Sequence, residues 1–335
     1  MRANAVFHVG RRRVEVRELD LRAPAAGEVL VRSRCSAISP GTEALVFAGD
    51  FPADAALDSR IASLGGSFEY PFRYGYALVG EIMAVGPGVD ASLAGRMVFA
   101  FHPHQDFAIV PAQDCLPVPD GLAPEAALFL PQVETAVNLV LDGAPLLGER
   151  VLVFGQGVVG LLTASVLARF PLARLAAIEP LAWRRELAMR RGVPEAVDPD
   201  DDAQWQSLLA GLDGADLVFE LSGDMAALDR AIEAAGFGAR IVVGSWYGRR
   251  TRAVDLGGRF HRNRLRIVSS QVSTLDPALC GRWDRQRRLD TAWRMLAQLR
   301  PEELIGASYP LADCASAFEA VGARRDGLMQ VIFEY

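Results

Sequence analysis

The chain has 335 residues, of which 51% are hydrophobic, and a formal net charge of −6 at pH 7. All 35 of its lysine-or-arginine positions are arginine, which excludes Schiff-base and pyridoxal-phosphate catalysis, Walker-type phosphate loops and Tyr–Lys catalytic pairs. The acidic, intermixed charge also argues against a nucleic-acid partner, which would need a basic face. At about 150 residues per domain, this length predicts roughly two domains.

The cysteines and the N-terminal pattern bear on location. The four cysteines are isolated, with no C-x-x-C pair, at Cys35, Cys115, Cys280 and Cys314. The first twenty residues alternate charged and apolar side chains and do not resemble a signal peptide. Residues 151–168 carry no charge over a length typical of a membrane span, but three glycines and Gln156 within them indicate a strand, a turn and a helix. We therefore expect a soluble, cytoplasmic protein with no membrane partner.

The predicted elements change character along the chain. Residues 1–120 contain short alternating runs separated by Pro, Gly and Asp, which predicts a β-rich region. Residues 123–143 have helical spacing that Pro131 interrupts. From residue 149 strands and helices alternate: strands are predicted at 149–155, 173–180, 215–223, 239–246 and 264–273, and helices at 158–170, 180–192, 199–212 and 225–236. This order predicts an α/β fold with a doubly wound parallel sheet. A long helix (282–299), a short helix (312–322) and a last strand (328–335) follow.

A glycine-rich turn marks a candidate dinucleotide site. The G-x-G-x-x-G motif follows a predicted strand and opens a helix, and consists of Gly155, Gln156, Gly157, Val158, Val159 and Gly160. Its first glycine permits a tight turn, its second lets the backbone approach a diphosphate, and its third allows close helix–strand packing. Glu179 ends the second strand 19 residues after Gly160, where an acid can bind the adenosine ribose hydroxyls. We expect a nicotinamide dinucleotide here.

The residues after the second strand bear on which dinucleotide binds. The carboxylate of Glu179 repels a 2′-phosphate and favours NAD over NADP. Arg184 and Arg185 could instead bind that phosphate, or could lie on a solvated helix face. Five further residues end or follow strands of the sheet and should line the cofactor cleft at its carboxyl edge: Ser222, Gly244, Trp246, Ser270 and Gln271.

Several stretches together resemble the medium-chain dehydrogenase/reductase superfamily over nearly the whole chain: 38–43 (ISPGTE), 75–89 (GYALVGEIMAVGPGV), 107–129 and 151–160. The resemblance implies a GroES-like substrate domain formed by residues 1–132 and 275–335, and a Rossmann domain formed by residues 133–274. It also implies hydride transfer with the cofactor and a homodimer through the Rossmann sheet edges.

The catalytic-zinc branch of that superfamily differs from this chain at its ligands. Pro40 stands at the position of a ligand cysteine, Tyr76 at that of a ligand histidine, and Leu130 or Pro131 near the third ligand. The loop with four structural-zinc cysteines is also missing, so we expect no zinc. The I-S-x-G-T-E and G-Y motifs resemble more closely the bacteriochlorophyllide dehydrogenase-like branch, which oxidises a hydroxyethyl side chain. That resemblance implies the reaction type and leaves the substrate open.

Without zinc or lysine, the chain needs other groups to handle a proton. The candidates are Thr42 as a relay hydroxyl, Tyr76 as a hydrogen-bond donor or acid, and His102 or His104 as a base. The two histidines would share one strand face, which leaves a weak metal site as an alternative. Tyr76 could equally fill the vacated zinc space. Glu43 could orient Thr42 or cap a turn. Glu134, which lies beside Thr135, could likewise orient a hydroxyl group or have a purely structural role.

We therefore expect a zinc-independent, nicotinamide-dependent oxidoreductase that interconverts an alcohol and a carbonyl on a small or medium organic substrate. Because an ordinary tyrosine is a better proton donor than base near pH 7, a zinc-free quinone or enoyl (C=C) reductase is the alternative. A non-catalytic nicotinamide-binding sensor or subunit is the alternative from another class.

Overall fold

The computed structural model describes residues 1–52, 56–58, 61–323 and 325–335. The chain divides into two compact units. The first unit consists of Met1–Pro131 and Arg300–Tyr335, and the second of Gln132–Leu299.

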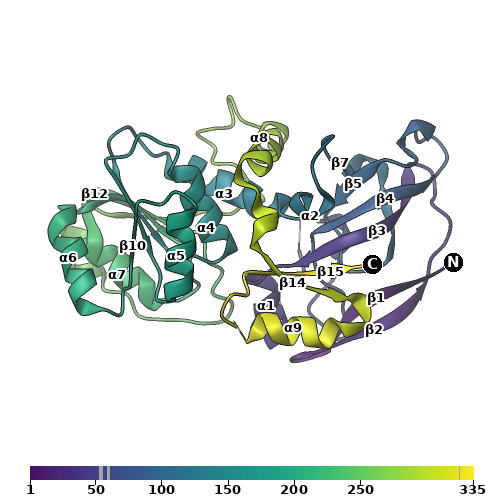
Figure 1. Ribbon diagram of the computed structural model, residues 1–335, viewed down its shortest axis with the longest axis horizontal. Helices are drawn as coiled ribbons and strands as arrows, with labels where there is room; N and C mark the ends of the chain where they lie inside the picture. Colours follow the sequence, from purple (N-terminus) through teal and green to yellow (C-terminus); the bar gives the residue numbers. More distant parts are fainter. Residues whose placement is uncertain (53–55, 59–60, 324) are drawn as a thin grey trace. The chain divides into compact units, whose positions relative to one another are not determined.

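The first unit is β-rich (Figure 1). Its elements are β1 (Arg2–Gly10), β2 (Arg13–Asp20), β3 (Glu28–Ile38), α1 (Thr42–Ala48), β4 (Leu78–Val85), β5 (Met97–Ala100), β6 (Phe107–Pro111), β7 (Leu116–Pro117), α2 (Pro124–Ala127), β14 (Ile305–Pro310), α9 (Cys314–Gly322) and β15 (Gln330–Glu334). Strands β1 and β2 form a hairpin, and a larger sheet has the order β14-β15-β3-β4-β5-β7, with β6 also paired to β3. Strand β15 pairs antiparallel with β3, Val331 opposite Ile38, so the last strand of the chain lies in this unit.

The second unit is a doubly wound α/β fold. Helix α3 (Leu130–Gly143) begins two residues before it, and the unit then contains β8 (Arg150–Phe154), α4 (Val158–Leu167), β9 (Arg174–Ile178), α5 (Ala182–Arg190), β10 (Glu195–Val197), α6 (Asp202–Leu212), β11 (Ala215–Glu220), α7 (Ala226–Ala234), β12 (Ala235–Val243), β13 (Arg266–Ser269) and α8 (Arg285–Leu299). The described strands are parallel in the order β10-β9-β8-β11-β12-β13. The strand order reverses between β8 and β11, where dinucleotides bind in such sheets.

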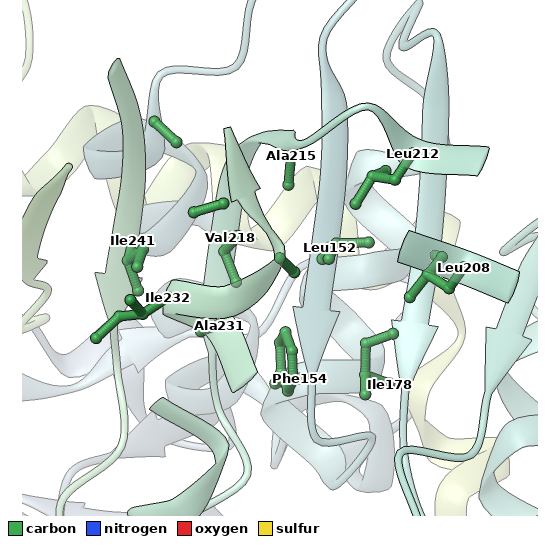
Figure 2. Packing of buried hydrophobic residues seen from close by; sticks show 14 of the residues in the cluster. Leu152, Phe154, Ile178, Leu208, Leu212, Ala215, Val218, Ala231, Ile232 and Ile241 are labelled. Atoms are coloured by element: carbon green, nitrogen blue, oxygen red, sulfur yellow. The ribbon is translucent and has the colours of Figure 1, made fainter. Parts of the chain in front are cut away.

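The core of the second unit explains why these segments are strands and helices. Alternate residues of the strands, such as Leu152, Ile178 and Val218, point to one face of the sheet and meet apolar side chains of α6 and α7. Figure 2 shows Leu208 and Leu212 of α6 packed over these strand residues. Helices α4 and α5 contact β8, β9 and β10, and Figure 1 shows them on the other side of the sheet. The prediction of a parallel α/β sheet with a separate β-rich domain is confirmed.

The structure differs from the expected boundary at residue 275. Residues 275–299 lie in the second unit and not with the β-rich domain. The physical reason is on α8: Arg288 is buried, and it donates to Glu134 Oε1 from Nε at 3.0 Å and to Asn138 Oδ1 at 2.7 Å. Because a buried guanidinium needs such partners, this helix stays against α3.

Two predicted elements are also shorter in the structure. The strand expected at 264–273 covers only Arg266–Ser269. The helix expected at 225–236 ends at Ala234, and Gly236 is already part of β12. No helix in the described ranges combines the length and apolar character that a membrane span requires.

Candidate functional site

The glycine-rich turn connects β8 to α4 in a conformation that demands glycine at two positions. Gly155 has φ +82, and a Cβ there would lie 2.4 Å from Ser222 Cα. A Cβ on Gly160 would lie 1.9 Å from the carbonyl oxygen of Gly155. These two glycines therefore permit the tight turn and the close packing of the helix on it.

Gly157 differs from the other two glycines because its surroundings are open. It precedes α4 with φ −67, and among the described atoms a Cβ on it would meet nothing within 4 Å. The first helical hydrogen bond after it runs from Leu161 N to Gly157 O, so the N–H groups of Val158, Val159 and Gly160 lie ahead of the helical pattern. Open space beside backbone donors at a helix N-terminus fits a diphosphate.

Glu179 lies at the carboxyl end of β9, nearly completely buried. Its Oε2 accepts a hydrogen bond from Gln156 N at 2.7 Å, and its Oε1 accepts one from Leu181 N at 3.1 Å. The carboxylate thus ties the glycine-rich turn to the loop after β9. Each of its oxygens can accept more than one hydrogen bond, so a ribose hydroxyl can still bind there.

The two arginines after Glu179 have different surroundings. Arg185 donates to the carbonyl oxygens of Glu179 and Pro180 and pairs with Asp198 at 3.0 Å. Arg184 lies over the ring of Trp183 and 3.8 Å from Glu179 Oε2. Arg184 is therefore the arginine closer to the Glu179 carboxylate, beside the position that a 2′-phosphate would take.

The carboxyl ends of β11, β12 and β13 carry the other predicted cofactor residues. Gly244 directly follows β12 and Ser270 directly follows β13. Ser222 lies two residues beyond β11, and its N–H donates to Glu220 Oε1 at 2.8 Å. Trp246 and Gln271 are exposed. All five residues therefore follow strands of the sheet, and their contact with a cofactor stays a prediction.

Sequence reasoning missed Glu220 at this edge. Glu220 is completely buried at the end of β11, and its carboxylate accepts hydrogen bonds from the hydroxyl groups of Ser222 and Tyr247. Burial and this carboxylate raise the pKa of Tyr247. The signal was available: Glu220 ends an apolar strand in the same way as Glu179.

A network of polar side chains connects Ser270 to α3 and α8. Ser270 Oγ donates to Asp142 Oδ2 at 2.5 Å, and Asn138 Nδ2 donates to the same carboxylate at 2.9 Å. Asn138 in turn accepts from Arg288, the partner of Glu134. Burial raises the pKa values of Glu134 and Asp142, although Arg288 opposes this effect. Glu134 therefore has an ion-pair role in the structure.

In the first unit, Tyr76 has two neighbouring hydroxyl groups. The hydroxyl groups of Ser39 and Thr42, which lie just before and at the start of α1, act on its phenol and lower its pKa. Burial, followed by the charge of Glu43, raises the pKa of Tyr76 to about 12. The phenol is therefore protonated near pH 7 and can donate a proton.

The prediction that His102 and His104 share a strand face is wrong. Both residues lie between β5 and β6, outside any strand, because Pro103 between them has no N–H for a ladder. His102 Nδ1 lies 3.0 Å from the carbonyl oxygen of Pro103, and burial lowers the pKa of His102 to about 4. A weakly basic imidazole of this kind does not support the base role expected for His102.

His104 is completely buried between two polar side chains. Its Nε2 lies 2.9 Å from Glu43 Oε2, and its Nδ1 lies 2.8 Å from Ser36 Oγ. Glu43 Oε1 also accepts a hydrogen bond from Ser39 N at 2.8 Å. Glu43 thus caps the turn before α1, which is one of the two roles predicted for it, and it also contacts His104. The other predicted role, orienting Thr42, stays a prediction.

Comparisons with known proteins agree with the observed fold. A family model described as "Zinc-binding dehydrogenase" matches residues 158–285. D-guloside 3-dehydrogenase of Escherichia coli K12 is 26% identical over 317 residues, which cover 90% of this chain and 91% of that protein. A crystal structure described as a short chain alcohol dehydrogenase from E. coli CFT073, complexed with NADH, matches with a TM-score of 0.81 at 19% identity, covering 100% of this chain and 99% of that one. These similarities support the resemblance to the medium-chain dehydrogenase/reductase superfamily that the sequence motifs indicate.

The solved structures with a similar fold differ in their bound cofactor. A Sinorhizobium meliloti 1021 protein solved bound to NADP matches with a TM-score of 0.80 at 17% identity, and the match covers 100% of both chains. The solved relatives thus include an NADH complex and an NADP complex.

The replacement of zinc ligands at Pro40, Tyr76 and Leu130 or Pro131 stays a prediction from the resemblance. Pro40 and Tyr76 are half-buried, and Leu130 is completely buried. Within the part of the chain that the structure describes, no group of three or more His, Cys, Asp or Glu side chains could hold a metal ion.

Proposed function

We propose that the protein is a zinc-independent, nicotinamide-dependent oxidoreductase that interconverts an alcohol and a carbonyl on a small or medium organic substrate. The observation that carries this proposal is the turn at residues 155–160, where two glycines are packed against backbone and Gly157 faces open space. The name of the E. coli relative, D-guloside 3-dehydrogenase, supports an alcohol as substrate.

The second unit offers the groups that would hold the cofactor. The N–H groups of Val158, Val159 and Gly160 would bind the diphosphate, and Glu179 would bind the adenosine ribose. When bound, the nicotinamide supplies the hydride donor or acceptor. The chain's own residues must then move the proton.

Tyr76 is the residue that we propose for the proton. Its raised pKa, about 12, keeps the phenol protonated, so it would donate a proton to the oxygen of a carbonyl being reduced. The hydroxyl groups of Ser39 and Thr42, which lower the pKa of this phenol, would return a proton to it. A protonated donor also supports the second candidate, a C=C reductase, because an enolate needs the same proton.

Zinc independence follows from the chemistry at the ligand positions. Pro40, Leu130 and Pro131 have no side-chain atom that binds zinc. The phenol of Tyr76 resists ionisation because of its burial and the nearby Glu43. We expect turnover to persist after dialysis against a chelator, with far less than one zinc per chain by elemental analysis. Stoichiometric zinc that is required for turnover would contradict this part of the proposal.

We propose NAD as the preferred cofactor. The support is the buried carboxylate of Glu179, which repels a 2′-phosphate, and the opposing feature is Arg184 beside it. Fluorescence titrations with NADH and NADPH compare the two directly. We expect NADH to bind at least about tenfold more tightly, a difference of about 1.4 kcal/mol, and tighter NADPH binding would reverse the assignment.

We also propose a homodimer through the sheet edge at β13. In the described sheet β13 is a terminal strand, and its Ile267 and Val268 are exposed. An unpaired strand edge with apolar side chains is suited to pairing with a second copy. Light scattering on the purified chain should give twice the monomer mass, and a monomer at micromolar concentration would contradict the dimer. A cytoplasmic location stays a prediction from the sequence.

The reaction itself is tested with a panel of alcohols, ketones and enones. Oxidation or reduction of the nicotinamide is followed by absorbance, with the Tyr76→Phe variant as comparison. We expect turnover of alcohol–ketone pairs, with kcat about a hundredfold or more lower in Tyr76→Phe. Turnover of enones alone would favour the C=C reductase. Binding without turnover on the whole panel would favour a sensor or a non-catalytic subunit.

A further inference from the structure

A buried chain of four polar side chains crosses the first unit beside Tyr76. Tyr335 OH lies 2.8 Å from Ser36 Oγ, Ser36 Oγ lies 2.8 Å from His104 Nδ1, and His104 Nε2 lies 2.9 Å from Glu43 Oε2. Ser36, His104 and Glu43 have no exposed surface. We call Tyr335, Ser36, His104 and Glu43 the buried polar chain.

The hydrogen bonds of the buried polar chain have a single direction when the His104 ring is neutral and Glu43 is ionised. A carboxylate only accepts, so His104 Nε2 carries the proton that it donates to Glu43. His104 Nδ1 is then an acceptor and receives the hydroxyl proton of Ser36. Ser36 in turn accepts from Tyr335 OH. Each of the four side chains has a partner, which a completely buried polar group requires.

Two contacts link the buried polar chain to Tyr76. Glu43 Oε1 accepts from Ser39 N at 2.8 Å, and this bond holds the segment whose hydroxyl groups, on Ser39 and Thr42, influence the phenol. On the other side, a Cβ on Gly75 would lie 2.7 Å from His104 Nε2, so the His104 ring packs directly against the residue before Tyr76.

We propose that the buried polar chain positions Tyr76 for proton transfer by fixing both Gly75 and the Ser39–Thr42 segment against it. Its members are positioning residues, since they act through Tyr76 and its two hydroxyl partners. This inference rests on the proposed function, in which Tyr76 is the proton donor. The serine of the chain is completely enclosed, so it cannot act as a nucleophile on a substrate.

Nuclear magnetic resonance on the full chain tests this role without any turnover. The protein contains only 6 tyrosines and 4 histidines, so labelling tyrosine with ¹³C at Cζ and histidine with ¹⁵N gives few resonances. The variants Tyr76→Phe and His104→Gln assign the two resonances that matter. The test variants are Ser36→Ala, which removes the hydroxyl partner of His104, and Glu43→Gln, which removes the charge and replaces one of the two acceptor oxygens with a donor NH2 group.

Ser33→Ala is the matched control. Ser33 is also a buried serine of β3, and its hydroxyl donates to the carbonyl oxygen of Gln105 at 2.5 Å, outside the buried polar chain. We expect the Tyr76 resonance to shift in Ser36→Ala and in Glu43→Gln and to stay unchanged in Ser33→Ala. Circular dichroism confirms folding, and Ser36→Ala keeps the test open if Glu43→Gln fails to fold.

The proposal is overturned if the His104 resonance shifts in Ser36→Ala while that of Tyr76 does not, or if Ser33→Ala shifts Tyr76 equally. With the best substrate of the panel, we expect Ser36→Ala to lower kcat about tenfold or more while KM changes little. An unchanged kcat would also overturn the proposal. Absence of turnover in the unaltered protein would instead contradict the proposed function, and the spectral comparison would still decide the positioning role.

Discussion

At the scale of single residues, substitutions at Gly157 and Gly160 should have different effects: the first on cofactor binding and the second on stability. An added methyl group at Gly157 meets no described atom, and the backbone angle there suits any residue. We expect Gly157→Ala to keep its stability and to raise the Kd for NADH about tenfold or more, because the methyl group occupies the space of the diphosphate. Fluorescence titration and thermal unfolding measure the two effects.

Gly160→Ala is the comparison for that prediction. Its methyl group would lie 1.9 Å from the Gly155 carbonyl oxygen, so we expect a loss of about 1–3 kcal/mol in the free energy of unfolding. Equal NADH affinity in Gly157→Ala and the unaltered chain would show that the diphosphate does not lie against this turn.

His8 gives a prediction for stability against pH. Its ring is completely buried against Phe72 and Phe318, and neither ring nitrogen has a hydrogen-bond partner among the described atoms. Burial, with a smaller effect of His104, lowers the pKa of His8 to about 3. Between pH 6.5 and 3 the unfolded state therefore binds more protons than the folded state, and stability falls as the pH is lowered through this window.

We expect His8→Leu to reduce this pH dependence by at most about 1.4 kcal/mol per pH unit. Urea unfolding at pH 7 and pH 5 measures it. A slope that is identical in His8→Leu and the unaltered chain would refute the account of His8.

At the scale of elements, helix α6 illustrates how one apolar face holds a helix to the sheet. Leu208 is only 1% exposed and packs over the strands (Figure 2). We expect Leu208→Ala to lower the free energy of unfolding by about 2–5 kcal/mol, through lost burial and the cavity left behind. Gln206→Ala, on the exposed face of the same helix, is the control and should change stability by less than about 0.5 kcal/mol.

The elements also show where sequence patterns predict structure well. The alternation of strands and helices after residue 149 is a local property, and apolar runs such as VLVF before the turn predicted β8 and its neighbours. The placement of α8 in the second unit could not be predicted from local patterns in this way. It depends on the pairing of Arg288 with Glu134, 154 residues apart, and an arginine-rich helix has no local sign of its partner.

At the scale of the whole molecule, the sequence predicted the glycine-rich turn of the second unit better than the polar groups around Tyr76 in the first unit. The residues of a glycine-rich turn are consecutive, and the roles of Gly155 and Gly160 depend on local packing. The groups around Tyr76 come from distant segments, as the bond between Ser36 and Tyr335 shows. Spacing in the sequence could suggest His104 but could not identify Glu43 and Ser36 as its partners.

The central claim concerns hydride transfer between the nicotinamide cofactor and the substrate. The most direct measurement uses NADH deuterated at C4, incubated with the chain and the ketones and enones of the panel, followed by mass spectrometry of the products. We predict deuterium on the carbinol carbon of an alcohol product. Deuterium at the former C=C carbon of an enone, or in no product at all, would contradict an alcohol–carbonyl oxidoreductase.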